Sequence, residues 1–177
     1  MVDQWKVLVI SDSHGWTERA ERVIRELERS IDAVYFLGDY LKDGEALSRK
    51  FPQLAFLSVA GNCDFTNKNQ FFSVNVAGHK LYLCHGHKYG VKDSYDSIRS
   101  FGLAGGYDVV LFGHTHRPYV DDTEDILLLN PGSIGMPIAL YGADYAVLKL
   151  KKGCHPQYHF GDSSKSVAEI IQFLQKN

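Results

Sequence analysis

The sequence lacks the features that mark membrane-bound and secreted proteins. No apolar run approaches the roughly 20 residues that are needed to cross a bilayer. The opening residues, from Met1 to Lys6, have neither the basic start nor the apolar stretch of a secretory signal peptide. Cysteines are few, and Cys63, Cys84 and Cys154 form neither a CxxC pair nor an even set for a disulfide framework. We therefore expect a protein of the reducing cytoplasm that makes no contact with membranes.

An excess of positive charge is also missing. The 19 lysine and arginine residues are balanced by 21 aspartate and glutamate residues, which gives a net charge of −2. Such a chain has no basic field for a nucleic acid, so extended nucleic-acid binding is not expected. If the substrate carries phosphate, a local positive charge has to attract it, and bound cations would supply that charge.

The length and composition predict a single domain over residues 1–177. A chain of 177 residues lies within the usual range for one domain. Hydrophobic residues make up 45% of it, which is enough to build a core without disulfides. No linker, low-complexity stretch, charge run or internal repeat divides the sequence.

The first third of the chain alternates between apolar runs and helical patterns. Residues 6–10 are almost wholly apolar, which is typical of a strand that is covered on both faces. A helix is expected over 17–29 and a second strand over 33–37, which together complete a βαβ unit. A short helix over 44–50 and a strand over 54–59 continue the alternation.

The rest of the chain is rich in hairpin patterns. Strands over 71–76 and 80–84 are joined by Ala77-Gly78-His79, and Phe71 and Phe72 are expected in the core. The further elements expected are a helix over 94–103, a strand over 109–112, strand pairs over 118–120 with 126–129 and over 145–150 with 157–160, and a helix over 164–175. One sheet containing every strand would be very large. We therefore predict an α/β fold with two stacked mixed sheets flanked by helices.

Side chains of the kind that bind metals follow directly after the apolar runs. These residues are Asp12, His14, Asp39, Asn62, His85, His114 and His116. Mixed carboxylate and imidazole ligands suit Mn²⁺, Fe, Zn²⁺, Co or Ni better than Ca²⁺ or Mg²⁺. One catalytic ion commonly takes three protein ligands, so this set is too large for a single ion. Two ions about 3.5–4 Å apart, sharing one carboxylate, would use all of it.

The same positions carry a resemblance to a known family. Asp12-Ser13-His14, Gly38-Asp39, Gly61-Asn62, His85-Gly86-His87 and Gly113-His114-Thr115-His116 resemble, in order, the five blocks of the calcineurin-like metallophosphoesterases. The short chain, Cys63-Asp64 after the third block, and Asn130-Pro131-Gly132-Ser133 are similar to the small bacterial and archaeal phosphodiesterases of that family. The resemblance implies a four-layer α/β/β/α sandwich and hydrolysis of phosphate esters.

The resemblance also implies a role for each block. Asp12, His14 and His116 would hold one ion, Asp39 would bridge to the second, and Asn62, His85 and His114 would complete the second site. Two divalent ions, with Mn²⁺ as the first choice, would activate a bridging hydroxide that attacks a small phosphodiester. Asp39, Asn62 and His85 would be catalytic through these ions.

The residue after the third block departs from the family pattern. Many members carry histidine there, where it protonates the leaving group, whereas this chain has Cys63, a weak donor. The general-acid step is therefore open: either water or metal assists the leaving group, or another group reaches in, with Asp64 and His87 as candidates. Asn62, Cys63, Asp64 and Arg117 are the candidates for contact with the substrate, and His87 is better explained as a loop or supporting residue than as a ligand.

Taken singly, the ligand residues also suit ordinary structural roles. Asp12 could cap a helix, Asp39 could form a turn, and His85 and His114 could bond to backbone in a core. The joint order of five blocks disfavours all of these roles. The same site would also serve a phosphomonoesterase, and a non-catalytic metal-binding scaffold exists within the family. Apolar hairpins in the second half allow a homo-oligomer.

Overall fold

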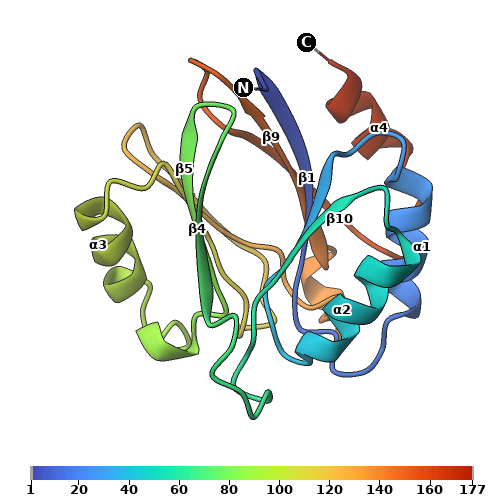
Figure 1. The fold of residues 1–177 in the computed structure, drawn as a ribbon, viewed down its shortest axis with the longest axis horizontal. Coiled ribbons are helices and arrows are strands. Elements are labelled where there is room, and N and C mark those ends of the chain that lie inside the picture. Colours follow the sequence, from blue (N-terminus) through green and yellow to red (C-terminus); the bar gives the residue numbers. More distant parts are fainter. Residues whose placement is uncertain (1, 177) are drawn as a thin grey trace.

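The computed structural model describes residues 2–176, which form two stacked five-stranded sheets between layers of helix (Figure 1). Helices α1 (Glu18–Leu27), α2 (Leu41–Lys50) and α4 (Ala168–Gln175) cover the outer face of the first sheet. Helix α3 (Asp96–Ala104) covers the outer face of the second. The expected α/β/β/α sandwich of two mixed sheets is confirmed.

The first sheet has the strand order β10-β9-β1-β2-β3. Its strands are β1 (Gln4–Ile10), β2 (Ala33–Phe36), β3 (Ala55–Ser58), β9 (Tyr145–Lys151) and β10 (Gln157–Gly161). β1, β2 and β3 run parallel, while β9 is antiparallel to both of its neighbours. This arrangement is the βαβ alternation expected from the first third of the sequence, extended by the hairpin near its end.

The second sheet has the strand order β4-β5-β6-β8-β7. Its strands are β4 (Phe71–Val76), β5 (His79–Cys84), β6 (Val109–Leu111), β7 (Tyr119–Asp122) and β8 (Leu127–Asn130). β5, β6 and β8 run parallel, whereas β4 and β7 join them as antiparallel edge strands. Each sheet therefore has three adjacent strands that pair in parallel, and its other strands are joined through antiparallel pairing.

Strand β1 shows why a strand of this fold is apolar at successive positions. Leu8 and Ile10 are fully buried among the residues under the helices, whereas Val7 and Val9 are fully buried between the two sheets. Because successive side chains of a strand point to opposite faces, a strand between two apolar layers needs apolar residues at every position. The continuous run over 6–10 is therefore explained by burial on both sides.

The first hairpin differs from the expectation in its turn and in one aromatic residue. His79 pairs with Val76, so the turn is only Ala77-Gly78, and both turn residues have positive φ, as a tight hairpin requires. His79 is buried rather than part of the turn. Phe71 is 56% exposed instead of lying in the core, because β4 is an edge strand whose alternate residues face away from the other sheet.

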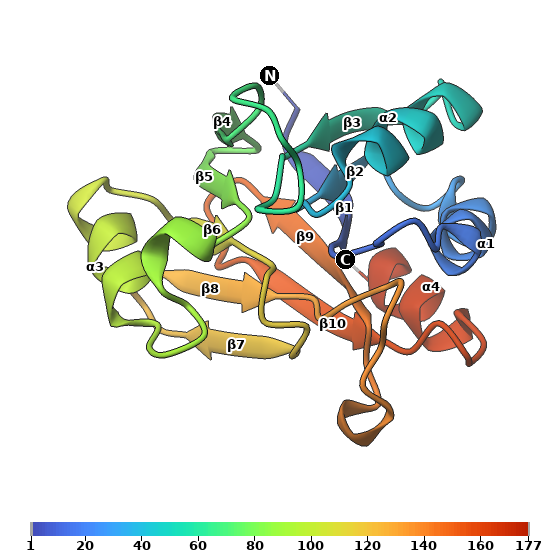
Figure 2. The same ribbon diagram turned by 90° about the horizontal axis from the view of Figure 1, so that it is seen from below.

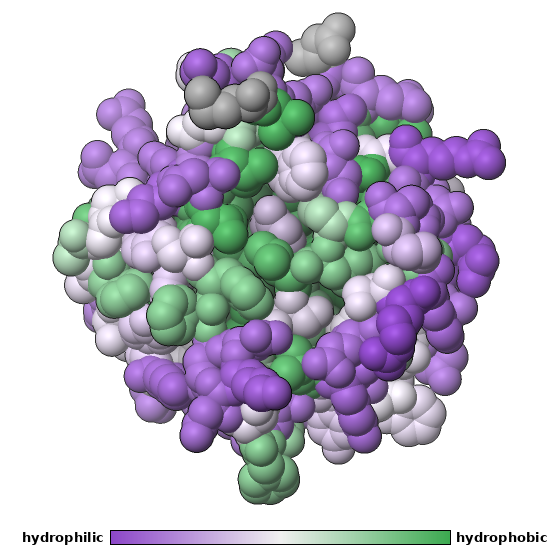
Figure 3. Space-filling view, viewed as in Figure 1, coloured by the Kyte–Doolittle hydropathy of each residue, from purple (hydrophilic) through white to green (hydrophobic). Residues whose placement is uncertain are grey.

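The face shown in Figure 3 is apolar near its middle, where β3 and β4, the edge strands of the two sheets, lie side by side. Leu57 of β3 and Val74 of β4 are partly buried there against the core between the sheets.

A homo-oligomer, a single domain and a cytoplasmic location all stay predictions. Among residues 2–176, no helix combines the length and the apolar character that a membrane crossing requires.

Candidate metal centre

The seven side chains of the predicted site lie in five loops at one edge of the sandwich. The loops follow β1, β2, β3, β5 and β6, and this edge of both sheets faces the reader in Figure 2. Backbone hydrogen bonds tie neighbouring loops together: the N–H of Asp12 donates to the carbonyl of Gly38 at 2.8 Å, and that of Gly113 to His85 at 3.1 Å. The parallel strands of both sheets thus bring distant parts of the chain to one place.

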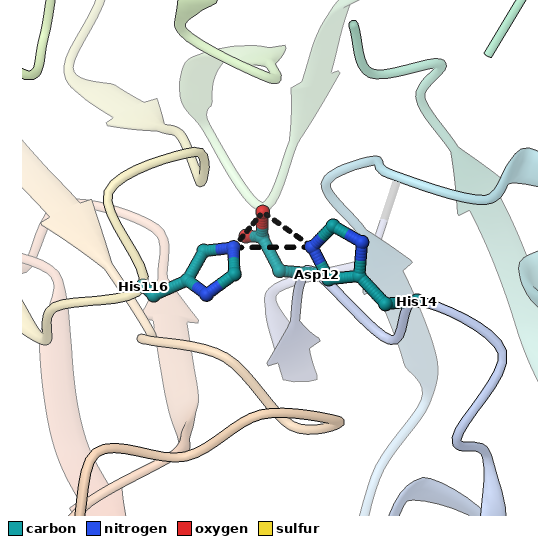
Figure 4. Close-up of side chains that lie close together, drawn as sticks. All are labelled: Asp12, His14 and His116. Atoms are coloured by element: carbon teal, nitrogen blue, oxygen red, sulfur yellow. Dashed lines mark hydrogen bonds and ion pairs between the residues drawn. The ribbon is translucent and has the colours of Figure 1, made fainter. Parts of the chain in front are cut away.

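The first group of donor atoms comes from Asp12, His14 and His116 (Figure 4). Nε2 of His116 lies 3.2 Å from Oδ1 of Asp12 and 3.1 Å from Nε2 of His14. The remaining separation, from Nε2 of His14 to Oδ1 of Asp12, is 4.0 Å. Ligands bound at about 2.0–2.2 Å from one ion lie about 3–4 Å from one another, so this spacing suits a single cation.

The second group is built around His85. Its Nε2 lies 3.3 Å from Oδ1 of Asp39 and 3.2 Å from Oδ1 of Asn62. The other oxygen of Asp39, Oδ2, lies 3.6 Å from Nε2 of His14 in the first group. Each oxygen of the Asp39 carboxylate therefore faces a different group, which is the placement expected of a bridging ligand.

A buried oxygen of Asp12 supports the view that this constellation is built for a cation. The side chain of Asp12 is fully buried, and within residues 2–176 its Oδ1 accepts no hydrogen bond. Three imidazoles surround that atom, with Nε2 of His116, His85 and His14 at 3.2, 3.9 and 4.0 Å. A buried carboxylate oxygen without a donor is costly, and a divalent ion between it and the imidazoles would satisfy it. The donor set therefore fits a metal.

His114 lies beside these groups. Its ring centroid is 5.0 Å from that of His85, and its backbone N–H donates to Oδ2 of Asp12 at 3.1 Å. Its ring nitrogens fall outside the three sets of acidic, histidine and cysteine donors that gather at the centre among the described residues. Burial and the charge of His85 lower the pKa of His114 to about 4. The ring is thus neutral near pH 7, which is the form that binds metals.

Asp39 and His85 influence each other's pKa in the protein without metal. Burial raises the pKa of Asp39, but hydrogen bonds and charge from His85, with the N–H of Cys63, outweigh it and hold that pKa well below its usual range. Burial likewise opposes the charge of His85, but Asp39 and Asp12 raise its pKa above the ordinary value. Asp39 is therefore an anion, and His85 tends to keep a second proton.

The backbone at the predicted ligands is unusual. Asp12, His14, Asp39, His114 and His116 have φ values of 54°, 48°, 48°, 70° and 58°, in the left-handed region that side chains rarely adopt. Such conformations cost on the order of 1–3 kcal/mol each and gather at functional sites, where the surroundings enforce them. The strained backbone therefore coincides with five of the seven predicted ligands. No residue pattern signals this strain in advance.

Asp43 is a supporting residue that the sequence analysis missed. It lies on α2, and its Oδ2 accepts hydrogen bonds from Oγ of Ser13 at 2.7 Å and from the N–H of Gly15 at 2.8 Å. These bonds anchor the loop that carries Asp12 and His14 to helix α2. The place of Asp43 in the first turn of the helix that directly follows the second block was the available signal.

A second support comes from the turn after β8. Nδ2 of Asn130 donates to the carbonyl of Gly113 at 2.7 Å, and Oγ of Ser133 donates to the carbonyl of Asp12 at 2.8 Å. Both groups are buried. The turn therefore positions the first loop and the loop of His114 and His116 together, a role for which the sequence offered only the resemblance.

The candidate substrate residues lie in different settings. Both oxygens of Asp64 accept backbone N–H groups, from Leu41 at 2.8 Å and from Gly61 at 2.9 Å, which tie the third loop to the start of α2. The side chain of Arg117 is exposed. The ring of His87 lies 5.5 Å from that of His85. Contact of Asp64 and Arg117 with a substrate stays a prediction.

Cys63 lies at the rim of the centre. It is exposed, and its backbone N–H donates to Oδ1 of Asp39 at 3.0 Å. Partial burial, together with a hydrogen bond and charge from Asp39, raises the pKa of the Cys63 thiol to about 11. Without a cation the group is thus protonated at neutral pH.

Comparison of the sequence with known proteins identifies a family whose metal dependence agrees with this geometry. Residues 5–153 match the family model of the calcineurin-like phosphoesterase superfamily domain. The probable metallophosphoesterase YsnB of Bacillus subtilis is 33% identical over 93% of this chain and 95% of its own. The chain therefore belongs to the calcineurin-like phosphoesterase superfamily, a metal-dependent family.

Two solved structures share its fold. A predicted phosphoesterase from Streptococcus pneumoniae superposes with a TM-score of 0.71 over 90% of this chain and 99% of that one, at 22% identity, which shows the shared fold. The phosphoesterase YfcE of Escherichia coli superposes with a TM-score of 0.60 at 26% identity over 81% of this chain and 87% of that one. The resemblance to the small phosphodiesterases is thus confirmed.

Proposed function

We propose that this protein is a phosphodiesterase that works with two divalent ions, Mn²⁺ being the first choice and Fe, Zn²⁺, Co or Ni the alternatives. The position of Asp39 carries the proposal, because one carboxylate oxygen lies 3.6 Å from His14 and the other 3.3 Å from His85. A carboxylate between two sets of donors suits a pair of ions about 3.5–4 Å apart.

The residues of the chain define how such a centre would work. Bound divalent ions supply Lewis acidity, which acidifies water and neutralises phosphate oxygens. Asp39 contributes the negative charge that keeps two like charges close together, and Asn62 offers an uncharged oxygen. His85 is oriented by its Nδ1, which donates to the carbonyl of Leu37 at 2.8 Å and leaves Nε2 facing Asp39 and Asn62.

The charges around the centre favour a diester over a monoester. A diester carries one negative charge, whereas a monoester has a further anionic oxygen that needs a cationic partner. Among residues 2–176, the ion pairs of Asp12 and Asp39 are all with histidines. Lys88 and Arg117, the basic residues that directly follow ligand blocks, are both exposed. The substrate we propose is therefore a small phosphodiester.

A comparison of two chromogenic substrates tests this proposal. Protein loaded in turn with Mn²⁺, Co²⁺, Ni²⁺ and Zn²⁺ is offered bis(p-nitrophenyl) phosphate and p-nitrophenyl phosphate. We expect kcat/KM to be higher for the diester. A higher value for the monoester would make the protein a phosphomonoesterase. Binding of the ions without turnover of either substrate would favour a scaffold.

A further inference from the structure

A sulfur atom joins the donors on the open side of the centre. Sγ of Cys63, a ring nitrogen of His14 and a carboxylate oxygen of Asp39 all lie within 4.8 Å of one another. His14 and Asp39 belong to the donor groups described above. Cys63 is therefore placed beside the same ion that His14 and Asp39 would hold, and not at a separate site.

The loop that carries Cys63 is fixed rather than free to swing away. Its backbone N–H is bonded to Oδ1 of Asp39 at 3.0 Å, and the preceding Gly61 N–H is bonded to Asp64 at 2.9 Å. Nδ2 of Asn62 lies 3.6 Å from the sulfur. Asn62 and Cys63 are thus held side by side at the rim, with the thiol reaching both the centre and the solvent.

The unpartnered oxygen of Asp12 is an independent sign that a cation belongs next to this sulfur. Oδ1 of the fully buried Asp12 lies 4.0 Å from Nε2 of His14, the imidazole that also takes part in the group with Cys63. The imidazole of His14 therefore lies near both the oxygen of Asp12 that lacks a donor and the thiol of Cys63.

We propose that Cys63 is a thiolate ligand of the ion bound by His14 and Asp39. This inference rests on the proposed metal dependence of the protein. On binding, the S–H bond breaks, the sulfur keeps the electron pair and bonds to the ion, and the proton leaves to solvent. Thiolate is a soft ligand, so it shifts the preference of this site from Mn²⁺ towards Zn²⁺ or Co²⁺. Cys63 thereby helps to determine which metal the centre takes.

X-ray absorption of the zinc-loaded protein tests the sulfur directly. Zn–S bonds are about 2.3 Å long and Zn–N and Zn–O bonds about 2.0–2.2 Å, so one sulfur ligand is resolved as a separate shell. We expect that shell in the wild-type protein and in Cys154→Ser, which removes another exposed free cysteine, but not in Cys63→Ser. In competition between the two ions, Cys63→Ser should lower the preference for Zn²⁺ over Mn²⁺ roughly tenfold or more.

The outcomes separate this inference from the proposed function. Zinc bound at full occupancy with nitrogen and oxygen neighbours alone would overturn the role of Cys63 and leave the metal-dependent function standing. A sulfur shell that persists in Cys63→Ser would also overturn it. Failure of the protein to bind any of the ions would overturn both. Circular dichroism of Cys63→Ser, whose side chain is exposed, verifies that the variant is folded.

Discussion

The carboxylate of Asp39 packs directly against the backbone of Gly61, so residue 61 has no room for a side chain. A Cβ atom there would overlap Oδ1 of Asp39 and lie 2.8 Å from its Cγ. We expect Gly61→Ala to push Asp39 away from the point between the two donor groups. Affinity for divalent ions, measured by calorimetry, should fall about 10–100-fold, the size of effect that positioning residues of metal sites show.

Gly106→Ala is the matched control. Nothing lies within 4 Å of a Cβ built on Gly106, although its φ is +63°. The variant should lose about 1 kcal/mol of stability through its left-handed backbone and should bind metal normally. Equal metal affinity in wild type and Gly61→Ala would show that Asp39 is not placed as described.

Asp43 should matter for activity although it touches no predicted ligand side chain. Asp43→Ala removes the acceptor of both Ser13 and Gly15, so the loop between Asp12 and His14 loses its support from α2. We expect diesterase activity and metal affinity to fall together, by about 10–100-fold. Glu45→Gln, an exposed change on the same helix, should leave both unchanged. A loss of thermal stability with unchanged metal affinity would refute the positioning role.

Much of this architecture could be predicted because apolar runs and ligand blocks alternate along the chain. The run over 6–10 lies within β1, and 33–37 includes β2, since burial on both faces leaves a strong pattern. The ligands could be predicted as a set because the ends of parallel strands meet at one edge. No distance between any two of them could be derived in this way.

The parts that could not be predicted depend on contacts between distant residues. α2 begins at Leu41, three residues before the expected start at 44, and the N–H of Leu41 is bonded to Asp64, 23 residues further along the chain. The exposure of Phe71 follows from the place of β4 at the edge of its sheet. The order of the strands in a sheet cannot be derived from the local periodicity of the sequence. The support from Ser133 likewise joins residues 121 positions apart.

Asp39→Asn should remove most of the activity. The amide keeps the shape of the side chain but replaces one oxygen, and the negative charge between the two donor groups is lost. We expect kcat/KM for bis(p-nitrophenyl) phosphate to fall at least about 100-fold, as when an electrostatic group of an active site is removed. Metal content after dialysis should fall as well. Asp93→Asn, at an exposed position, is the control, and wild-type metal content in Asp39→Asn would contradict the bridging role.

The charge on His85 predicts how metal binding depends on pH. Although burial opposes it, Asp39 and Asp12 raise the pKa of His85 in the metal-free protein above its ordinary 6.5. This raised pKa stabilises the metal-free fold below pH 6.5, and that contribution is lost as pH rises through the folded pKa. An ion that binds at Nε2 must displace the proton. Affinity should therefore increase with pH, and the part of this increase that is due to His85, at most about tenfold per unit for one proton, should end above the pKa of His85.

Calorimetry of metal binding in buffers with different ionisation enthalpies measures the protons released. Below the raised pKa of His85 we expect one proton from His85 and, with Cys63 bound as a thiolate, a second from its thiol, while His114, with a pKa of about 4, releases none near pH 7. A titration of the metal-free protein followed by the histidine resonances in NMR should assign the high pKa to His85. His155→Asn, which changes an exposed histidine paired with Asp122, should leave the count of released protons unaltered. A titration in which the pKa of His85 does not exceed 6.5 would show that Asp39 and Asp12 do not favour its protonated form.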